Sequence, residues 1–511
     1  MIENIFYGLT SALQPGILLV VFIGVLLGMI VGTLPGLTST LGVAILVPLT
    51  FVMRPEAGLA MLGGMYCAST YSGAISAILI GIPGTPANCA TLLDGQAMTK
   101  KGEANQALVL ATIASCIGGL ISIIPLLFIA PALAQVSLKF GSFEYFLLAI
   151  FGISIIASLA EESLEKGLIS GIIGLFLAIV GMHPLTGFLR FTYGRTSLFD
   201  GVPVIVGMVG LYSIPEIISL ISKKKKINSH LIPINFSARI TFQEVIQGIK
   251  EVYRQKWNVF RSSIIGTIVG IIPGAGCSIG GFVAYDQAKR FSKEPEKFGT
   301  GWAEGIIASE SGNNATPAGT LIPLLTLGVP GNAVSAVFLG ALIIHGLRPG
   351  ADLFAGSANI MYTFIMSLFL GNLFFVPIGL IICSYGLKML LIPRAILASL
   401  VGLLAIMGSF TIRANMEDVL IMLAVGLIGY AMVRNDVPRA PAVLGLVLGT
   451  MAESELARSF SIVRGDYWIF ITKLITRPIC LILLTLTVFS ILQGIQSRQK
   501  KAKRNMNKNL S

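Results

Sequence analysis

The amino-acid sequence predicts an all-α polytopic membrane protein, and three observations lead to this fold class. Hydrophobic residues make up 54% of the 511-residue chain and charged residues only 12%, about half the charged fraction of a soluble domain. The mean hydropathy is +0.85. Apolar runs of roughly 17 to 25 residues, long enough to cross a bilayer core, recur along almost the whole chain, so we expect about 10–12 transmembrane segments.

The candidate membrane segments form two series separated by a polar loop. The first series comprises residues 16–53, 57–82, 106–131, 143–160, 166–189 and 202–222. The second comprises residues 259–285, 303–332, 333–347, 360–382, 393–411, 417–433, 440–452 and 469–493. Runs 16–53 and 259–285 have awkward lengths for simple spans, which indicates interrupted or re-entrant helices. The first 15 residues lack the features of a signal peptide, so we expect the first apolar run to be retained as a helix.

The basic residues orient the chain in the membrane. The net charge of +12 is concentrated in loops and in the tail that begins at Arg498. The positive-inside rule predicts that the loop and the tail are cytoplasmic, and these charges suit anionic lipid headgroups better than nucleic acid. The predicted organisation is a first membrane repeat (1–222), a cytoplasmic basic linker (223–258), a second membrane repeat (259–495) and a basic cytoplasmic tail (496–511).

Two sequence blocks recur in the same order in the two halves. GMIVGTLPGLTSTLG (28–42) aligns without gaps on GTIVGIIPGAGCSIG (266–280), and ILIGIPGTPAN (78–88) recurs as LTLGVPGNAV (325–334). The segment before the first half carries no basic residue, whereas the loop before the second half is strongly basic. This asymmetry favours an extracytoplasmic N-terminus and two inverted repeats, as in many secondary transporters.

The repeated proline–glycine pairs predict helix breaks inside the membrane. Proline removes a backbone donor and clashes with the preceding turn, and glycine tolerates non-helical conformations. Breaks at matching positions of two repeats are the best sequence-level pointer to a substrate site near the membrane midplane. Broken helices offer N-termini to anions and C-terminal carbonyls to cations. For Gly24, Gly28, Gly32, Gly266 and Gly270, close helix packing is the favoured interpretation.

The candidate substrate-binding residues are those of the four breaks and their polar neighbours. They are Pro35, Gly36, Thr38, Ser39, Thr40, Pro83, Gly84, Thr85, Asn88, Pro273, Gly274, Gly276, Ser278, Pro330, Gly331 and Asn332.

The stretch ASESGNNAT is the most polar one flanked by apolar turns, and it supplies the candidate cation-coupling residues. They are Glu310, Ser311, Asn313, Asn314 and Thr316. A carboxylate among amide and hydroxyl oxygens suits a sodium ion or a proton, although Glu310 in a surface loop is an equally good interpretation. Asp94 fits either a gate or a loop cap, with the cap favoured. Arg348 fits an interfacial arginine better than a substrate ligand.

Enzyme chemistry and resident metals are not expected. The six cysteines and three histidines are scattered without metal-ligand or redox spacing, and the cysteines suit small packing residues. No lysine follows the glycines of 266–281 as in a phosphate-binding loop. We therefore expect no cofactor other than a coupling ion, Na⁺ or H⁺. An anion-selective channel remains an alternative because filters also use unwound backbone, but the duplicated breaks favour a carrier. A stand-alone carrier for another organic anion is a further alternative.

Together, the GxxPG blocks, GIPGTPAN, SESGNNAT and LTLGVPGNA resemble the large membrane subunit, TctA type, of the tripartite tricarboxylate transporters, over residues 15–460. The resemblance implies cation-driven uptake of citrate-like tricarboxylates or related carboxylates across the cytoplasmic membrane. It also implies two protein partners, a small membrane subunit (TctB type) and an extracytoplasmic solute-binding protein (TctC type). By looser analogy, the paired interrupted segments suggest an elevator-like carrier.

Overall fold

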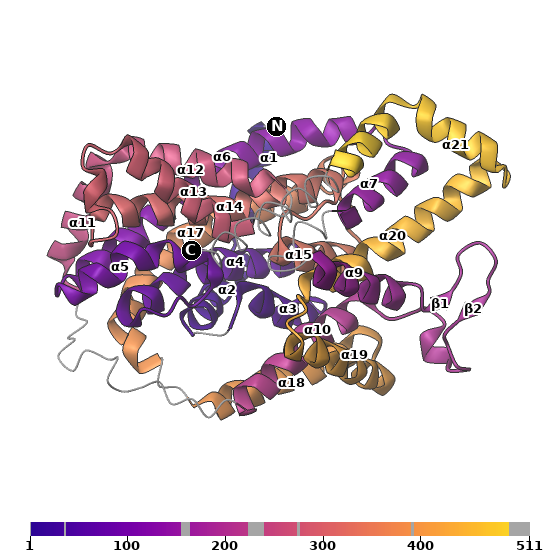
Figure 1. Ribbon diagram of the computed structural model, residues 1–511, viewed down its shortest axis with the longest axis horizontal. Helices are drawn as coiled ribbons and strands as arrows, with labels where there is room; N and C mark the ends of the chain where they lie inside the picture. The colour runs from indigo at the N-terminus through magenta and orange to yellow at the C-terminus, as the bar shows by residue number, and fades with distance from the viewer. Residues whose placement is uncertain are drawn as a thin grey trace, which may run out of the picture. The chain divides into compact units, whose positions relative to one another are not determined.

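The computed structural model describes residues 2–34, 37–154, 164–222, 240–272, 276–389 and 393–489, and these residues are almost entirely helical. The chain forms two compact units, each assembled from both the early and the late part of the sequence. Unit 1 comprises Met1–Ala134 and Glu216–Ile412, and unit 2 comprises Gln135–Pro215 and Arg413–Ser511. The all-α prediction is confirmed (Figure 1), whereas the two repeats with their predicted boundaries stay a prediction.

Unit 1 contains the helices that carry the sequence blocks described above. Its elements are α1 (Ile2–Ala12), α2 (Pro15–Thr33), α3 (Ser39–Thr50), α4 (Pro55–Ile80), η1 (Pro86–Cys89), α5 (Thr91–Lys100), α6 (Ala104–Ser137), α11 (Phe242–Arg254), α12 (Lys256–Ile271), α13 (Gly276–Phe291), η4 (Pro295–Lys297), α14 (Ala303–Leu327), α15 (Ala333–Ile344), α16 (Ala351–Ala355), α17 (Ala358–Met389) and α18 (Arg394–Arg413). Helix α6 continues into unit 2 for its last residues, and α18 ends at its boundary.

Unit 2 is smaller. Its elements are α7 (Ser142–Ser154), α9 (Leu164–Ala178), β1 (Gly181–Met182), β2 (Leu189–Arg190), η2 (Thr196–Leu198), most of α10 (Val204–Ser222), α19 (Met416–Arg434), α20 (Ala440–Ile462), α21 (Tyr467–Thr476) and a helix at Pro478–Phe489. Strands β1 and β2 pair antiparallel, so the predicted segment 166–189 is a helix followed by a small hairpin. The last two helices meet at a bend of 86°.

Seven described helices are long and apolar enough to span a membrane, or eight if the bent pair counts as one span. The protein is therefore a multi-pass membrane protein. Helices α4 and α14 are not among the seven, although they are 26 and 25 residues long. Both are rich in small and hydroxyl residues, and both are buried along nearly their whole length. The helices that face the protein interior on all sides thus carry the polar residues of unit 1.

Glycines let the helices of unit 1 approach closely. A Cβ atom at Gly28 would lie 2.5 Å from the carbonyl oxygen of Met65 on α4, and one at Gly270 would lie 2.6 Å from that of Thr316 on α14. Gly24 and Gly32 meet α4 in the same way, and Gly266 meets α14. The packing interpretation of these glycines is thereby confirmed, and it explains why α2 with α4 and α12 with α14 form the most extensive helix contacts.

The four predicted breaks coincide with helix ends. Helix α2 ends at Thr33 and α3 begins at Ser39, while α12 ends at Ile271 and α13 begins at Gly276. Helices α4 and α14 both end at a glycine in the left-handed conformation, Gly81 with φ 72° and Gly328 with φ 71°, where other residues are strained. The proline–glycine loop follows directly in both cases. Within the predicted segment 303–332, the helix therefore ends at Leu327.

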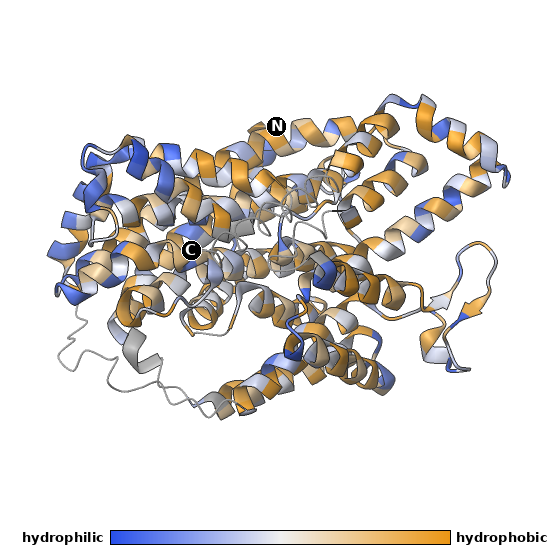
Figure 2. Cartoon of the chain, viewed as in Figure 1, coloured by the Kyte–Doolittle hydropathy of each residue, from blue (hydrophilic) through white to orange (hydrophobic). Residues whose placement is uncertain are grey.

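The segment predicted as a linker contains a helix. Residues 223–239 lie outside the described residues, but Phe242–Arg254 form α11 and Lys256 already begins α12. A capping box explains the start of α11, because the Thr241 hydroxyl accepts from the Glu244 backbone while the Glu244 carboxylate accepts from the Thr241 backbone. The sequence analysis missed this helix since its polar composition suggested a loop. Figure 2 shows hydrophilic residues gathered where α5, α11 and the loop after α13 lie.

Candidate functional site

Glu310 lies near the centre of α14 and is completely buried, with a relative exposure of 0%. This decides between the two interpretations left open by the sequence, because a surface loop is now excluded. A carboxylate inside an apolar bundle is costly unless donors or a counter-ion compensate it. Its surroundings therefore indicate what the site can hold.

Three side chains from the first half of the chain donate hydrogen bonds to the Glu310 carboxylate. The amide of Asn88 on η1 lies 3.3 Å from Oε1, the hydroxyl of Thr91 on α5 also contacts Oε1, and the hydroxyl of Ser115 on α6 lies 2.7 Å from Oε2. The Thr91 hydroxyl is also 3.2 Å from that of Ser309. The acid of the second half is thus held by three separate elements of the first half.

The first proline–glycine loop is tied to the same place through Asn88. The Thr85 hydroxyl donates to Asn88 Oδ1 at 2.6 Å, and the Asn88 amide donates to the Thr70 carbonyl at 3.0 Å. The Asn313 amide donates to the same Thr70 carbonyl at 3.2 Å. The motifs PGTPAN and SESGNNAT, which are more than 200 residues apart in the sequence, therefore share one hydrogen-bond network.

The second proline–glycine loop reaches α4 in a comparable way. The Asn332 amide donates to the Tyr66 hydroxyl at 2.8 Å, and this hydroxyl lies 3.2 Å from that of Thr320. Asn332 also caps α15 through a capping box with Ser335. Each loop thus combines a local structural role with a contact to the long buried helix of the other half.

Each proline–glycine loop also packs against the end of the broken helix of its own half. A Cβ atom at Gly84 would collide with the Gly32 carbonyl oxygen of α2, and one at Gly331 would lie 2.8 Å from the Gly270 carbonyl oxygen of α12. Among the described residues, Gly84 is thus brought against the end of α2, and Gly331 against the end of α12. Pro35, Gly36, Pro273 and Gly274 themselves lie outside the described residues.

The remaining predicted substrate residues occupy helix starts and loops. Thr38 caps α3 by accepting from Leu41 N at 3.2 Å, and Ser39 and Thr40 form the first turn of that helix. Gly276 and Ser278 lie in the first turn of α13, and the side chain of Ser278 is outside the described part of the structure. Pro83 is half-buried and Pro330 is buried in their loops.

The other predicted cation residues divide into two groups. The hydroxyls of Ser311 and Thr316 donate to carbonyls of their own helix, at Ile307 (2.6 Å) and Gly312 (3.0 Å). By contrast, Asn313 Oδ1 and both amide atoms of Asn314 are buried without a hydrogen-bond partner among the described residues. Such orphaned polar atoms are rare in proteins and commonly mark a site for water or an ion. Asn314 lies one helical turn after Glu310, on the same face of α14.

Several network members were not found by sequence reasoning. Tyr66, Thr70, Thr91, Ser115 and Thr320 all contribute atoms to the contacts described above. Single hydroxyl residues within apolar helices usually bond their own backbone, so they carry no distinctive pattern. Only the fold reveals which of them faces Glu310.

Asp94 is a buried loop anchor. Its carboxylate accepts hydrogen bonds from the Tyr285 hydroxyl at 2.8 Å and from the backbone N–H groups of Gly299, Gly301 and Trp302 at 2.8 to 2.9 Å. These contacts agree with the favoured interpretation of Asp94 as a loop cap, because its carboxylate holds the loop that precedes α14. Arg348 is exposed, in agreement with an arginine that is not part of the site.

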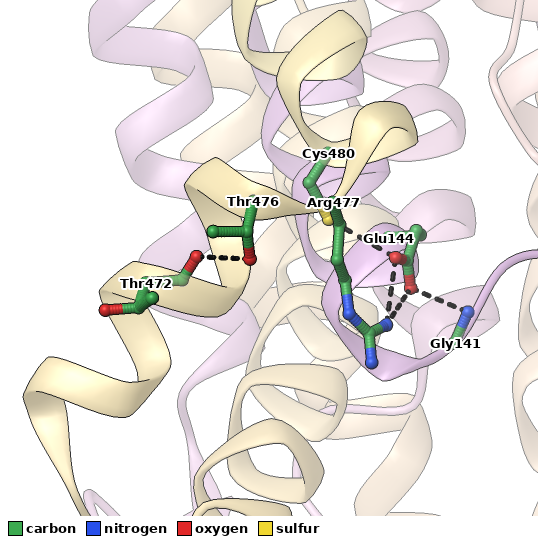
Figure 3. A network of polar contacts seen from close by, with 6 residues as sticks. All are labelled: Gly141, Glu144, Thr472, Thr476, Arg477 and Cys480. Carbon is green, nitrogen blue, oxygen red and sulfur yellow. Dashed lines mark hydrogen bonds and ion pairs between the residues drawn. The ribbon is translucent and has the colours of Figure 1, made fainter.

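Unit 2 contains a second buried acid, Glu144, at the start of α7 (Figure 3). Arg477, at the bend between α21 and the last described helix, donates to both carboxylate oxygens at 2.9 and 3.0 Å. The Gly141 backbone and the Cys480 thiol donate to the same carboxylate. Because these contacts join the start of α7 to the bend after α21, we interpret the pair as a structural tie.

Metal-ligand clusters are absent from the described residues, as judged from groups of histidine, cysteine and acidic side chains. The described cysteines are free thiols. Four of these five are buried in the helix packing, as the sequence predicted for small packing residues.

Comparisons with known proteins agree with the resemblance noted in the sequence. A protein of Agrobacterium vitis described as "Uncharacterized 52.8 kDa protein in TAR-I ttuC' 3'region" is 36% identical over 505 residues, covering 98% of both chains. A second protein of that organism, "Uncharacterized protein in TAR-II ttuC' 3'region", is 35% identical over 234 residues, which is 46% of this chain and 97% of that protein. No solved structure matches. Residues 18–444 match the family described as "Tripartite tricarboxylate transporter TctA family", and the chain therefore belongs to this family.

Proposed function

We propose that this protein takes up tricarboxylates or related carboxylates by symport with a cation, and that Glu310 is the group through which the cation is coupled. The observation that carries the proposal is the buried Glu310 carboxylate held by Asn88, Thr91 and Ser115. Membership of a transporter family provides the reaction class. Intramembrane acids that meet other polar groups inside a bundle characteristically belong to ion or proton pathways.

The arrangement suits a reversible cation site. The Glu310 oxygens, the two hydroxyls, the Asn313 and Asn314 side-chain oxygens and the Thr70 carbonyl are hard oxygen donors of the kind that sodium prefers. The same donors also stabilise the carboxylate when no metal cation is bound, and a proton would neutralise it directly. The site thus has two internally compatible occupants, Na⁺ and H⁺, and the experiment below distinguishes them.

The carboxylate substrate would bind beside this site, between the two proline–glycine loops. Asn88 links the first loop to Glu310, and Asn332 links the second loop to Tyr66 and Thr320. Loop backbone N–H groups and helix N-termini favour anions, so a cation at Glu310 would offset the like-charge repulsion between the acid and the substrate. This dependence of one ligand on the other is what symport requires.

The family works in a tripartite system with TctB-type and TctC-type partners. We propose that an extracytoplasmic TctC-type protein delivers the substrate and that a small TctB-type membrane subunit accompanies this chain. The proposed location is the cytoplasmic (inner) membrane, with a cytoplasmic C-terminus and an extracytoplasmic N-terminus. An anion channel is the second candidate, and an uptake that neither saturates nor responds to an imposed cation gradient would favour it.

The decisive experiment measures citrate uptake into proteoliposomes that contain the chain with its partner proteins. We expect accumulation under an imposed sodium or proton gradient, and the gradient that drives it identifies the coupling ion. Glu310→Gln should abolish gradient-driven accumulation because the amide cannot carry the compensating charge. Glu304→Gln, on the same helix but half-buried at its start, is the matched control and should keep it. Unchanged cation dependence in Glu310→Gln would remove this residue from the mechanism.

A further inference from the structure

The exposed apolar face of α11 lies outside the candidate site, on a helix that is otherwise largely polar. Phe242, Ile246, Ile249 and Tyr253 are exposed, with relative exposures of 80%, 37%, 48% and 70%. They recur every three or four residues, so they form one stripe along the helix. An exposed apolar stripe on a segment of otherwise polar composition requires a partner.

Three different faces can be distinguished around α11. Gly248 and Val252 are buried, and a Cβ atom at Gly248 would meet the side chain of Val109 on α6. The exposed residues Gln243, Gln247, Lys250 and Arg254 also recur every three or four positions, and they form a polar face. The helix therefore packs on protein with one side, presents polar groups on a second and exposes apolar groups on a third, which lies between the other two.

Helix α11 cannot cross a bilayer. Its 13 residues extend about 20 Å, at 1.5 Å per residue, whereas the hydrocarbon core is about 30 Å thick. A polar face along its whole length would also be placed in hydrocarbon. A helix with one apolar face and one polar face that includes basic residues is instead suited to the plane of the membrane interface, with its apolar side inserted at the level of the headgroups.

Residues that follow α11 in the sequence also indicate that this part of the chain lies at the membrane interface. Trp257, at the start of α12, is 75% exposed, and tryptophan is enriched at membrane interfaces. Phe260 and Ile268 on the same helix are also exposed, as expected for a helix that continues from the interface into lipid. Helix α11 is thus followed, two residues after its end, by a helix whose first turns expose aromatic side chains.

The charges on and beside this helix identify the lipid. The ammonium of Lys256 lies 5.5 Å from the centre of the Tyr253 ring, and Lys250 and Arg254 border the apolar stripe from the polar face. Arg254 also approaches Glu251 at 3.5 Å, on the side away from the stripe. Long basic side chains beside an interfacial helix can reach anionic headgroups, which attract them.

We propose that α11 lies in the plane of the cytoplasmic membrane surface and docks on anionic phospholipid, with Phe242, Ile246, Ile249 and Tyr253 inserted and Lys250, Arg254 and Lys256 at the headgroups. The helix then attaches the connection between the two halves of the chain to the lipid, and its buried face packs on α6 at Gly248. Neither the substrate site nor the coupling ion enters this inference, so it stands independently of the proposed function.

The test uses the full chain reconstituted in vesicles of phosphatidylethanolamine and phosphatidylglycerol. Nitroxide labels are attached at Ile246→Cys and Ile249→Cys, and at Gln243→Cys and Gln247→Cys as matched controls on the polar face. The unsubstituted chain is treated with the same label, and its signal gives the contribution of the native cysteines. We expect labels at 246 and 249 to collide mainly with oxygen, which concentrates in lipid, and those at 243 and 247 mainly with a water-soluble nickel chelate.

Two outcomes would overturn the inference. Equal access of the nickel chelate to all four labelled positions would show that the apolar stripe faces water. Labels at 246 and 249 that are shielded from both reagents would show that protein covers the stripe. The role of charge is tested with Lys250→Gln and Arg254→Gln together, which should lower the oxygen-to-nickel ratio at 246 in these vesicles. Lys100→Gln with Lys101→Gln removes the same charge from the end of α5 and should leave that ratio unchanged.

Discussion

At the scale of single residues, buried hydroxyl groups that look alike in the sequence have two different roles in the structure. Thr91 and Ser115 donate to the carboxylate, whereas Thr326 on α14 donates only to the carbonyl of Ile322, at 2.7 Å. All three are buried hydroxyls in apolar surroundings. Of these three, only Thr91 and Ser115 are expected to influence the coupling ion, because only they contact the carboxylate that we propose to bind it.

Thr91→Val and Ser115→Ala should each change the apparent affinity for the coupling cation by about tenfold, which corresponds to ~1.4 kcal/mol for a lost hydrogen bond to a charged group. If the cation is Na⁺, the affinity should fall because an oxygen ligand is lost. If it is H⁺, the affinity should rise because the charged carboxylate loses a donor. The measurement is the cation concentration that gives half-maximal uptake in proteoliposomes. Thr326→Val is the control and should leave this concentration unchanged. Equal effects of all three substitutions would mean that packing, and not ligation, determines the affinity.

Glycine at the proline–glycine loops is required by space. Gly84→Ala places a methyl group against the Gly32 carbonyl, and overpacking of this kind costs ~1–3 kcal/mol. We expect a lower thermal-unfolding temperature in detergent for Gly84→Ala. Gly16→Ala in α2 is the comparison, since nothing lies within 4 Å of its Cβ position, and it should unfold at the wild-type temperature or slightly above it. Identical behaviour of the two variants would contradict the close approach.

At the scale of elements, α11 is fastened at its start by Glu244. Burial tends to raise the pKa of this carboxyl, but hydrogen bonds from the Thr241 backbone, from Asn105 on α6 and from the Thr241 hydroxyl outweigh burial and lower the pKa below its ordinary value. A carboxyl with a lowered pKa stabilises the folded state at neutral pH, and this contribution is lost as the pH falls through the lowered pKa.

The start of α11 should therefore loosen in acid. Below a pH of about 4, we expect amide hydrogen exchange in residues 241–248 of the wild-type protein to be faster relative to the intrinsic exchange rate at the same pH, with a loss of stability of less than ~1 kcal/mol because the contact is partly exposed. Glu244→Gln should show the faster exchange already at neutral pH. Equal exchange in the variant and the wild type at both pH values would show that the carboxylate does not fasten the helix.

Elements also show where sequence reasoning succeeds. The breaks before Ser39 and Gly276 and the helix ends at Gly81 and Gly328 follow from local chemistry, because proline and glycine act on their own backbone. Helix α11 was missed because its apolar residues are few and lie on one stripe, which a search for continuous apolar runs does not detect. The contacts of Ser115 and Thr70 depend on packing between distant segments, and no local pattern encodes them.

At the scale of the whole molecule, the candidate site belongs to neither half alone. Asn88, Thr91 and Ser115 precede the loop between the halves and Glu310 follows it, while Asn332 reaches back to Tyr66. The blocks of both halves meet within unit 1. The sequence predicted that matching breaks would cooperate, but it could not predict that each loop would contact the long buried helix of the other half.

Separate expression of the two halves tests this assembly. Residues 1–222 and 240–511, produced as two chains in one cell, should associate in the membrane, because the hydrogen bonds and the helix packing that join them do not require the connecting loop. Co-purification through a tag on one chain and cation-dependent uptake by the pair are the measurements. Each half alone should show no uptake. Failure of the two halves to co-purify would mean that the connection itself is essential for assembly.

The hydrogen-bond network around Glu310 has a consequence for the electrical balance of transport. Pro83 and Pro330 are 247 positions apart, and in a sequence alignment with this offset Gly63 of α4 matches Glu310 of α14. Residue 63 is a glycine, so the aligned position carries no acid. The described side chains that donate hydrogen bonds to Glu310 are an amide and two hydroxyls, with no second carboxylate among them. In the proposed mechanism, this position would then carry one monovalent cation per cycle. For a citrate-like anion with three negative charges, one such cation leaves a net inward movement of negative charge, and a membrane potential that is negative inside would oppose it unless further cations enter elsewhere.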